Sequence, residues 1–345
     1  MSIRFIPMSY QQSQPTELFR KLKPIQIGHI HIEQPVILAP MSGVSDLPFR
    51  KTVRKYGAGL VVSEMIASQA IIRQSRQSLK MAQRSKEDFP MSVQLAGCEP
   101  ETMAEAAKLN EDLGADIIDI NFGCPAKKVV NNYAGSALMR DEQLAAAILK
   151  ATVEAVQIPV TLKMRMGWDQ QNLNAPRLAK IAEDIGIKMI TVHGRTRCQF
   201  YDGEADWHFI QKVKDSVKIP VIVNGDITNF DKVNQALDAS KADGIMIGRG
   251  CYGKPWFINQ VINYLQAGKI IPEPNIEQKL ATIIQHFEET LIHYGQEAGL
   301  RIFRKHIGWY SKGLPNSAEF RLAMSQEENP KRMISFITSL YQQSN

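Results

Sequence analysis

Short apolar segments recur along the chain, and each is followed by glycine, asparagine or another polar residue. They are rich in β-branched residues and short, which is typical of buried β-strands. Their first residues lie 23 to 44 positions apart. The eight predicted strands are Val36 to Ala39, Gly59 to Ser63, Met91 to Leu95, Asp116 to Asn121, Val160 to Lys163, Met189 to His193, Val221 to Asn224 and Gly244 to Ile247.

Amphipathic segments with helix signals lie between most of these strands. Strands that are apolar along most of their length are buried on both faces, as in a parallel sheet covered by helices. This alternation predicts the α/β class and a closed (β/α)₈ TIM barrel, with an open doubly wound sheet as the alternative. The clearest helical segments are Pro100 to Leu113, Glu142 to Val156, Ala175 to Ile185, Ala205 to Val217 and Asp231 to Ala239.

The strand pattern stops near residue 271, and only helical segments follow. We therefore expect a barrel domain over residues 25–271 and a small all-α domain over residues 272–345, with Pro272 to Pro274 as the linker. Residues 1–24 are polar without a clear period and are predicted to be a loosely held extension. The helices expected after the linker are Ile276 to Tyr294, Arg301 to Lys312, Ser317 to Met324 and Pro330 to Gln342.

The composition of the 345 residues is that of a globular protein: 44% are hydrophobic, 22% are charged, and the mean hydropathy is -0.21. No segment reaches the about 18 apolar residues of a membrane span or has a signal peptide's apolar core, so we expect a cytoplasmic location. The four cysteines lack metal-ligand spacing, so neither a metal site nor disulfides are predicted. A net charge of +6 suits both a polyanion-binding protein and an ordinary enzyme, and we expect a monomer.

The residues that follow the predicted strands are polar and distinctive. In a parallel barrel the active site forms where the strands end, so these residues are the candidates for chemistry. They read A-P-M-S-G (39–43), S-E-M (63–65), Q-L-A-G (94–97), N-F-G-C-P (121–125), K-M-R (163–165), H-G-R (193–195), N-G-D (224–226) and G-R-G (248–250).

Gly248 to Gly253 spells the GxGxxG motif of dinucleotide-binding proteins. That motif belongs to a unit with a further strand and an acidic residue about 20 positions on, and here a helical region follows instead. As the end of the eighth strand, the segment is predicted to bind a phosphate together with Asn224, Gly225 and Asp226. Backbone N–H groups and the Arg249 guanidinium would be the donors, and a purely structural glycine turn is the alternative.

Lys163 and Arg165 alternate along one strand and face the mouth of the barrel, and His193 ends the next strand. Positive side chains that converge on the barrel mouth without carboxylates predict that the site binds an anionic ligand or stabilises negative charge that develops during a reaction. Any one of these residues taken alone is equally well explained by a surface salt bridge.

Cys124 follows the fourth strand, and a segment rich in lysine, asparagine and glycine comes next, which predicts a long mobile loop over the mouth. A lone cysteine is commonly an inert buried residue. A neutral thiol at this place is also able to act as a general acid. Cys98, Cys198 and Cys251 are assigned structural roles.

Two segments carry an excess of positive charge. Arg73, Arg76, Lys80 and Arg84 are spaced 3, 4 and 4 within the acid-free stretch from Ile66 to Lys86, which predicts a cationic stripe on one helix face. Near the C-terminus, Arg301, Arg304 and Lys305 alternate with aromatic residues, a combination that suits RNA. A solvated helix face and, for Phe303 and Trp309, burial in the core are the alternatives.

Taken in order, these strand-end motifs, with N-F-G-C-P-A-K-K and R-K-H-I-G-W-Y, resemble the tRNA-dihydrouridine synthases, and the bacterial B subfamily in particular. The resemblance runs from about Ile25 to the C-terminal helices, and Ser42 is a departure where alanine is common. It implies a flavin mononucleotide (FMN) barrel that reduces the C5=C6 bond of selected tRNA uridines, at D-loop position 17 in the B subfamily, with NADPH as reductant.

The resemblance also implies a role for individual residues. Reduced FMN would give hydride to uracil C6, and Cys124 would donate the proton to C5. The implied flavin contacts are Pro40, Met41, Ser42, Gln94, Lys163, His193, Asn224, Gly225, Asp226, Gly248 and Arg249. The implied uracil contacts are Asn121, Arg165 and Arg195. The predicted contacts with the tRNA backbone are Arg73, Arg76, Lys80, Arg84, Lys127, Lys128, Arg301, Arg304 and Lys305.

Two other functions fit part of the pattern. A dihydroorotate-dehydrogenase-like flavoenzyme would share the barrel, the lysine and the phosphate site, but it has no need of a basic helical tail. A non-catalytic tRNA-binding or tRNA-folding module would use the basic surfaces, but it has no need of Cys124, Lys163 and His193 together at strand ends.

Overall fold

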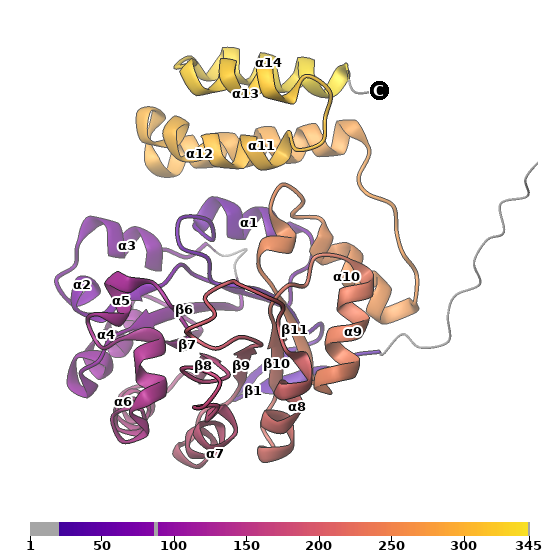
Figure 1. Ribbon diagram of the computed structural model, residues 1–345. Helices are drawn as coiled ribbons and strands as arrows, with labels where there is room; N and C mark the ends of the chain where they lie inside the picture. Colours follow the sequence, from indigo (N-terminus) through magenta and orange to yellow (C-terminus); the bar gives the residue numbers. More distant parts are fainter. Residues whose placement is uncertain (1–20, 86–88, 344–345) are drawn as a thin grey trace, which may run out of the picture.

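Eight parallel strands close into a barrel in the computed structural model, which describes residues 21–85 and 89–343 (Figure 1). The ring closes where β11 pairs with β3 and β4 pairs with β6, which excludes the doubly wound sheet. Each predicted strand is confirmed. In ring order the strands are β3 (Val36–Leu38), β4 (Leu60–Val62), β6 (Met91–Ala96), β7 (Ile117–Phe122), β8 (Val160–Arg165), β9 (Ile190–His193), β10 (Val221–Asn224) and β11 (Gly244–Ile247).

Nearly every side chain of these eight strands is buried. Lys163 is the one residue of the described barrel strands that keeps partial exposure. The apolar runs therefore mark strands packed on both faces, as their composition predicts. A lysine at the centre of such a strand stands out as a functional position.

Helices surround the barrel as the amphipathic segments predict (Figure 1). Several begin at a side chain that accepts a backbone N–H, including Asp46, Asp141, Asp206 and Asn229. The surrounding helices are α1 (Leu47–Lys55), α2 (Ser68–Ile72), α3 (Arg76–Ala82), α4 (Pro100–Asp112), α6 (Glu142–Ala155), α7 (Ala175–Ile185), α8 (Trp207–Ser216), α9 (Phe230–Ser240) and α10 (Phe257–Ala267).

A small hairpin that the sequence analysis did not predict closes one end of the barrel. Its strands β1 (Ile25–Ile27) and β2 (Ile30–Ile32) pair antiparallel around Gly28. Their isoleucines join Ile37, Leu60 and other strand residues in a separate apolar cluster. Because this cluster fills the amino-terminal end of the barrel, only the carboxyl end is left for a site. The alternating apolar and polar residues of this hairpin were the missed signal.

Four further helices form a layer beside α1 (Figure 1). They are α11 (Ile276–Tyr294), α12 (Gln296–Tyr310), α13 (Ser317–Gln326) and α14 (Pro330–Gln342). The layer has its own apolar cluster around Phe287, Phe303 and Met333. An all-α region after the barrel is thus confirmed, while the domain limits at residues 24 and 271 stay predictions. Residues 1–20 of the predicted extension lie outside the described residues.

The helical layer is attached to the barrel by ion pairs as well as by packing. Glu289 of α11 lies 3.2 Å from Nζ of Lys51 and 3.6 Å from Nζ of Lys55, both on α1. None of the described helices is both long enough and apolar enough to cross a membrane.

Candidate active site

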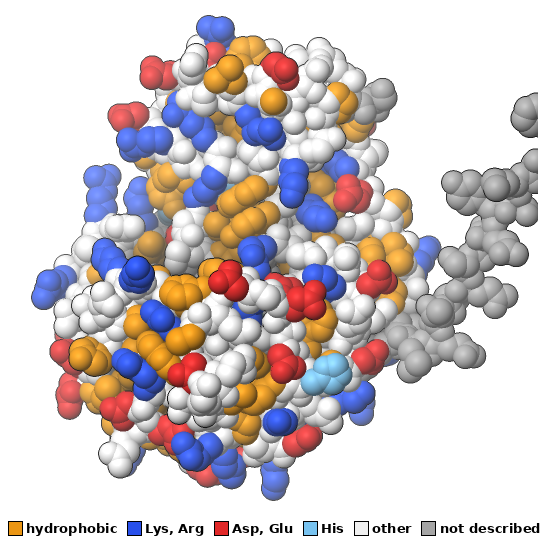
Figure 2. Space-filling model, viewed as in Figure 1, with side chains coloured by type: hydrophobic (Ala, Val, Ile, Leu, Met, Phe, Trp, Pro, Cys, Tyr) orange, Lys and Arg blue, Asp and Glu red, His pale blue; other side chains and the backbone are white. Residues whose placement is uncertain are grey.

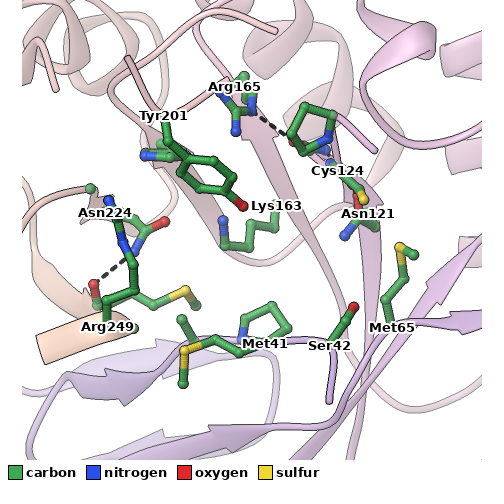
Figure 3. A pocket seen from close by; sticks show the side chains of 18 of the residues that line it. Met41, Ser42, Met65, Asn121, Cys124, Lys163, Arg165, Tyr201, Asn224 and Arg249 are labelled. Atoms are coloured by element: carbon green, nitrogen blue, oxygen red, sulfur yellow. Dashed lines mark hydrogen bonds between the residues drawn. The ribbon is translucent and has the colours of Figure 1, made fainter. Parts of the chain in front are cut away.

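A cavity of about 620 Å³ opens where the strands end (Figure 3). Every residue predicted to contact the flavin lines it, and so do Asn121, Cys124 and Arg165. Phe200 and Tyr201 line it as well, although no motif had singled them out, and so do Met65 and Tyr252, to which no role had been assigned. The closed barrel therefore brings together residues that are up to 213 positions apart, from Ala39 to Tyr252.

A chain of hydrogen bonds with a fixed direction lies beneath the cavity. The buried Asp119 carboxylate accepts from Gln94 Nε2 at 2.7 Å and from Thr161 Oγ1 at 2.6 Å. Gln94 Oε1 in turn accepts from Asn121 Nδ2 at 2.7 Å. Burial raises the pKa of Asp119, while the hydrogen bonds from Thr161 and Gln94 oppose that shift. Because both of its oxygens accept in this chain, Asp119 fixes which end of the Gln94 amide faces Asn121. Asp119 was missed by the sequence analysis, although it lies two positions before Asn121 on the same face of β7.

The other end of Asn121 holds the Cys124 turn. Its Oδ1 accepts from the backbone N–H of Gly123 at 3.0 Å and of Cys124 at 2.8 Å. The Cys124 carbonyl accepts from Ser136 Oγ at 2.8 Å. The segment after Cys124, predicted to be a long mobile loop, contains α5 (Lys127–Val130) and a 3₁₀ helix (Gly135–Arg140). The thiol is thus carried by a turn with defined partners on both sides.

Arg165 supports the same turn. Its Nε donates to the Gly123 carbonyl at 2.8 Å, and its Nη1 donates to the carbonyls of Thr196 at 2.7 Å and Phe200 at 2.8 Å. Burial lowers the pKa of Arg165 to about 10, so it stays charged at neutral pH. Because most of its donors are occupied by backbone carbonyls, its main structural role is to join the loops after β7, β8 and β9.

Lys163 points its ammonium group into the cavity (Figure 3). Among the described residues, no hydrogen bond or ion pair occupies its Nζ. Burial and the nearby Arg165 lower the pKa of Lys163 to about 8, while the Asp119 carboxylate opposes that shift. The amine therefore remains mostly protonated at neutral pH and is free to meet an anionic group of a ligand.

His193 is neutral in this environment. Burial, and then the charges of Lys163, Arg165, Arg195 and Arg249, lower its pKa well below the ordinary value. The expectation of converging cations without carboxylates needs correction, because His193 adds no charge and Asp119 and Asp226 lie among the cations.

Asp226 pairs with two arginines. Its carboxylate lies 2.5 Å from Arg195 Nη2 and 3.0 Å from Arg249 Nη2. Burial alone would raise the pKa of Asp226, but the Arg195 hydrogen bond and the Ala205 N–H hold it below the ordinary value. Arg195 also donates to the carbonyls of Asp202 and Gly203 and does not line the cavity, so its predicted contact with uracil is not supported. Arg249 keeps half of its side chain exposed.

Glycines form a tight cradle between the ends of β10 and β11. A side chain at Gly225, where φ is 117°, would place its Cβ 2.7 Å from the His193 ring. At Gly250 a Cβ would lie 2.4 Å from the Ile227 carbonyl oxygen. The backbone here therefore requires glycine, and both Gly225 and Gly250 line the cavity. The GxGxxG segment belongs to a closed barrel, as β11 pairs with β3, and not to a dinucleotide-binding unit.

The predicted cationic stripe is not a single helix face. Helix α2 ends before Arg73, Gln74 adopts a φ of 47°, and α3 starts a new direction. Arg84 lies 3.0 Å from the Asp116 carboxylate, and Lys80 Nζ donates to the His293 carbonyl at 2.9 Å. Of the four stripe residues, all within the described part of the chain, only Arg73 and Arg76 are exposed and have no acidic partner.

The basic residues of the helical layer also differ in role. Arg301, like Lys127 and Lys128 beside the site, is exposed. Arg304 is partly buried and donates to the Glu327 carbonyl at 3.4 Å. Lys305 is partly buried and lines a second cavity with Gly43, Glu64 and Arg76, and its contact with the tRNA backbone stays a prediction.

Aromatic residues complete the connection between the two parts. Phe303 is buried, as preferred from the sequence. Trp309 stacks on Tyr252, which lines the cavity, with ring centroids 4.0 Å apart. The helical layer is therefore part of the rim of the site. Cys251 is buried, whereas Cys198 is exposed and cannot fill core space as a structural cysteine would.

Lys and Arg side chains border the boundary between the helical layer and the barrel, with hydrophobic side chains between them (Figure 2). Searched over residues 21–85 and 89–343, the chain has no cluster of histidine, cysteine, aspartate or glutamate that fits a metal ion. The site has instead an uncommitted ammonium, a thiol on a braced turn and a glycine cradle. The fold is that of a (β/α)₈-barrel protein with a cavity at the carboxyl ends of its strands, where the active sites of such barrels lie.

Comparison with known proteins agrees with the barrel fold and identifies the family to which the chain belongs. The model of the dihydrouridine synthase (Dus) family matches residues 37–344. The chain belongs to the dihydrouridine synthase family. It is 61% identical over 321 residues to a probable tRNA-dihydrouridine synthase of Rickettsia bellii (strain RML369-C), covering 92% of this chain and 98% of that one. It is 49% identical over 306 residues to tRNA-dihydrouridine synthase B of Xanthomonas axonopodis pv. citri (strain 306), covering 89% and 92%. The resemblance to the B subfamily is confirmed.

Solved structures with the same fold are more distant. An old yellow enzyme homologue from Zymomonas mobilis superposes with a TM-score of 0.53 at 15% identity, covering 75% of this chain and 96% of that one. This likeness supports the barrel fold alone.

Proposed function

We propose that the protein is a flavin-dependent tRNA-dihydrouridine synthase, with Cys124 as the general acid and FMN in the strand-end cavity. The observation that carries the proposal is the joint placement of Cys124, Lys163 and the glycine cradle in one cavity of a chain from this family. An uncommitted cation and a thiol that line the same cavity suit a reaction in which negative charge develops and a proton is delivered.

The cavity fits FMN in size and in chemistry. A volume of about 620 Å³ lies in the usual range for cofactor sites. The cradle at Gly225, Gly248 and Gly250 would hold the phosphate through backbone N–H groups, and Arg249 would add a charged donor. Pro40, Met41 and Ser42 would line the ring system, opposite Lys163. His193 and Asn224 would contact the ribityl chain, and Asp226 would orient Arg249.

When bound and reduced, FMN supplies the hydride for uracil C6. Cys124 then donates its thiol proton to C5, and the hydrogen bonds from the turn to Asn121 hold the sulfur in place for that transfer. Lys163 would stabilise negative charge at the site because no hydrogen bond or ion pair of the described chain occupies its ammonium. Gln94 keeps a donor and an acceptor free to bond the polar edge of the ring system.

Uracil recognition falls mainly to Asn121. Its Nδ2 uses one hydrogen for Gln94 and keeps a second for a uracil carbonyl. Arg165 would approach the base only through the part of its guanidinium that the three carbonyls leave free.

Three finer points belong to the same proposal. NADPH is the expected reductant, and position 17 of the tRNA D-loop is the expected target. The helical region over residues 272–345 is expected to share tRNA binding with the barrel, through exposed cations such as Arg301, Lys127 and Lys128.

The test combines the visible absorption spectrum of the purified protein with mass mapping of tRNA from a strain that lacks it. We expect a flavin spectrum, and one missing dihydrouridine that the wild-type chain restores and Cys124→Ala does not. A colourless protein that still binds tRNA would favour a non-catalytic tRNA-binding module. Turnover of dihydroorotate with complete tRNA modification in the deletion strain would favour a dihydroorotate-dehydrogenase-like enzyme.

A further inference from the structure

Two arginine side chains share the ring of Trp168 on the rim of the barrel. Arg140 Cζ lies 4.1 Å and Arg197 Cζ lies 4.7 Å from the centroid of that ring. Arg197 Cζ also lies 4.8 Å from the centroid of Phe200, which lines the active-site cavity. Contacts of this kind hold a guanidinium by its flat face. Arg140 is exposed, whereas Arg197 is partly buried and its Nε is enclosed without a hydrogen-bond partner in the described chain. The Nη groups of the two side chains are therefore the donors that a ligand would meet.

The backbone around Trp168 is built to hold this arrangement. A Cβ at Gly167 would lie 1.9 Å from the Asn172 carbonyl oxygen, so only glycine fits before the tryptophan. The loops after β8 and β9 are joined by hydrogen bonds from Arg197 N to the Gly167 carbonyl at 3.0 Å and from Cys198 N to the Trp168 carbonyl at 2.9 Å. The strand-end reading of the sequence had given Trp168 and Arg197 no role.

Neither arginine is neutralised by the described chain. No ion pair joins Arg140 or Arg197 to a carboxylate within residues 21–85 and 89–343. Asp141, next to Arg140 in sequence, accepts from Leu144 N at 2.9 Å through Oδ1, and Asp169, next to Trp168, accepts from Asn172 N at 3.0 Å through Oδ1. Two adjacent cations without an acid repel each other, which favours an external anion.

The pair is attached to the turn that carries the catalytic thiol. Arg140 ends the 3₁₀ helix Gly135–Arg140, and Ser136 in its first turn donates to the Cys124 carbonyl through Oγ at 2.8 Å and through N at 3.2 Å. A ligand that bridges the two guanidiniums therefore lies on the same rim as Cys124.

We propose that Arg140 and Arg197 form a phosphate-binding site for the RNA strand that flanks the target nucleotide. The planar guanidinium fork matches the geometry of a phosphodiester, and phosphate contacts fix the register of a nucleic acid on a protein. This inference rests on the proposed function, because that function makes tRNA the polyanion that reaches this rim.

The test is the salt dependence of tRNA binding to the flavin-loaded Arg140→Ala/Arg197→Ala protein. We expect the slope of log K against log salt to fall by roughly 1.4, about 0.7 for each lost contact with single-stranded RNA. Arg177→Ala is the matched control, since Arg177 is exposed on the neighbouring α7 but lies 2.6 Å from Glu142. Its slope should equal that of the wild type. An unchanged slope in the double variant with normal flavin content would overturn the inference.

A second variant covers the chance that the double alanine protein fails to fold. Arg140→Lys/Arg197→Lys keeps both charges but loses the fork, so the salt slope should be kept while affinity falls several-fold. Equal affinity of the lysine variant and the wild type would contradict a bidentate phosphate contact. Dihydrouridine formation by the wild type is measured separately: if it is absent while the slope still falls in the alanine variant, the proposed function fails and the phosphate site stands.

Discussion

The strand-end site and the cationic stripe were both predicted from the spacing of residues in the sequence. The structure brings the strand-end residues together as predicted, but it does not place the four stripe residues on one helix face. Residues after parallel barrel strands meet at one rim whatever their distance along the chain, and Gln94, Asn121 and Lys163 line one cavity. The stripe depended on one unbroken helix, and the turn at Gln74 breaks it. The topology of a closed barrel thus predicts which residues meet more reliably than helical spacing does, because helical spacing applies only while the helix is unbroken.

The largest expected effect concerns Cys124. Cys124→Ala should lower dihydrouridine formation by about 10² to 10⁴-fold, the usual contribution of a general acid, while flavin content and tRNA affinity stay unchanged. Cys198→Ala, at an exposed cysteine, is the control and should be fully active. Near-normal turnover of Cys124→Ala, measured as dihydrouridine per tRNA, would remove Cys124 from the mechanism.

Lys163 offers a test in the opposite direction, on stability. Burial holds its pKa near 8, against about 10.5 in an unfolded chain, so below pH 8 the charged lysine costs the fold up to about 3 kcal/mol. Lys163→Met should therefore raise the melting temperature of the flavin-free protein at pH 7 while abolishing activity. Because the unfolded chain binds the extra proton between pH 8 and about 10.5, the wild type should gain stability over that range and the difference should shrink.

The control for that comparison is the exposed Lys188→Met, which should leave the melting temperature unchanged. A lower melting temperature for Lys163→Met at pH 7 would show that Lys163 is a structural residue.

Asp119 tests whether the buried hydrogen-bond chain positions the thiol. In Asp119→Leu both carboxylate oxygens are lost, so Gln94 Nε2 and Thr161 Oγ1 lose their acceptor and the Gln94 amide is no longer held toward Asn121. One lost buried hydrogen bond is worth about 1–3 kcal/mol, and kcat should fall roughly tenfold to a hundredfold with the KM for tRNA unchanged. The rate at which a thiol reagent labels Cys124 should change as well. Unchanged labelling and kcat would show that Asp119 only packs.

The smallest expected effect distinguishes the exposed pair of the predicted stripe, Arg73 and Arg76, from the bonded pair, Lys80 and Arg84. Arg73→Ala/Arg76→Ala should reduce the salt slope of tRNA binding by up to about 0.7 to 0.9 per residue, because both side chains are exposed. Lys80→Ala/Arg84→Ala should lower the melting temperature instead, because these side chains bond the His293 carbonyl and pair with Asp116. Equal salt slopes for both variants would restore the single-surface interpretation.

The sequence predicted the barrel, the helical layer and most of the cavity. Apolar runs mark the strands locally, and a closed parallel barrel brings the residues after every strand to the same end. The sequence could not predict that Arg195 turns to Asp226 or that Lys305 enters a second cavity, since these contacts join segments far apart along the chain. Asp119 and Trp168 were missed for the same reason. Their roles depend on neighbours in space, which residue type and spacing do not specify.

The measurement that tests the central claim most directly is a single turnover without oxygen. Protein reduced with NADPH and freed of excess reductant is mixed with tRNA that lacks dihydrouridine, and the visible absorbance of oxidised flavin is followed. We predict that this absorbance returns in proportion to the dihydrouridine formed, and that tRNA already carrying the modification leaves the flavin reduced. Flavin that stays reduced with unmodified tRNA, or a protein that holds no flavin, would contradict the account.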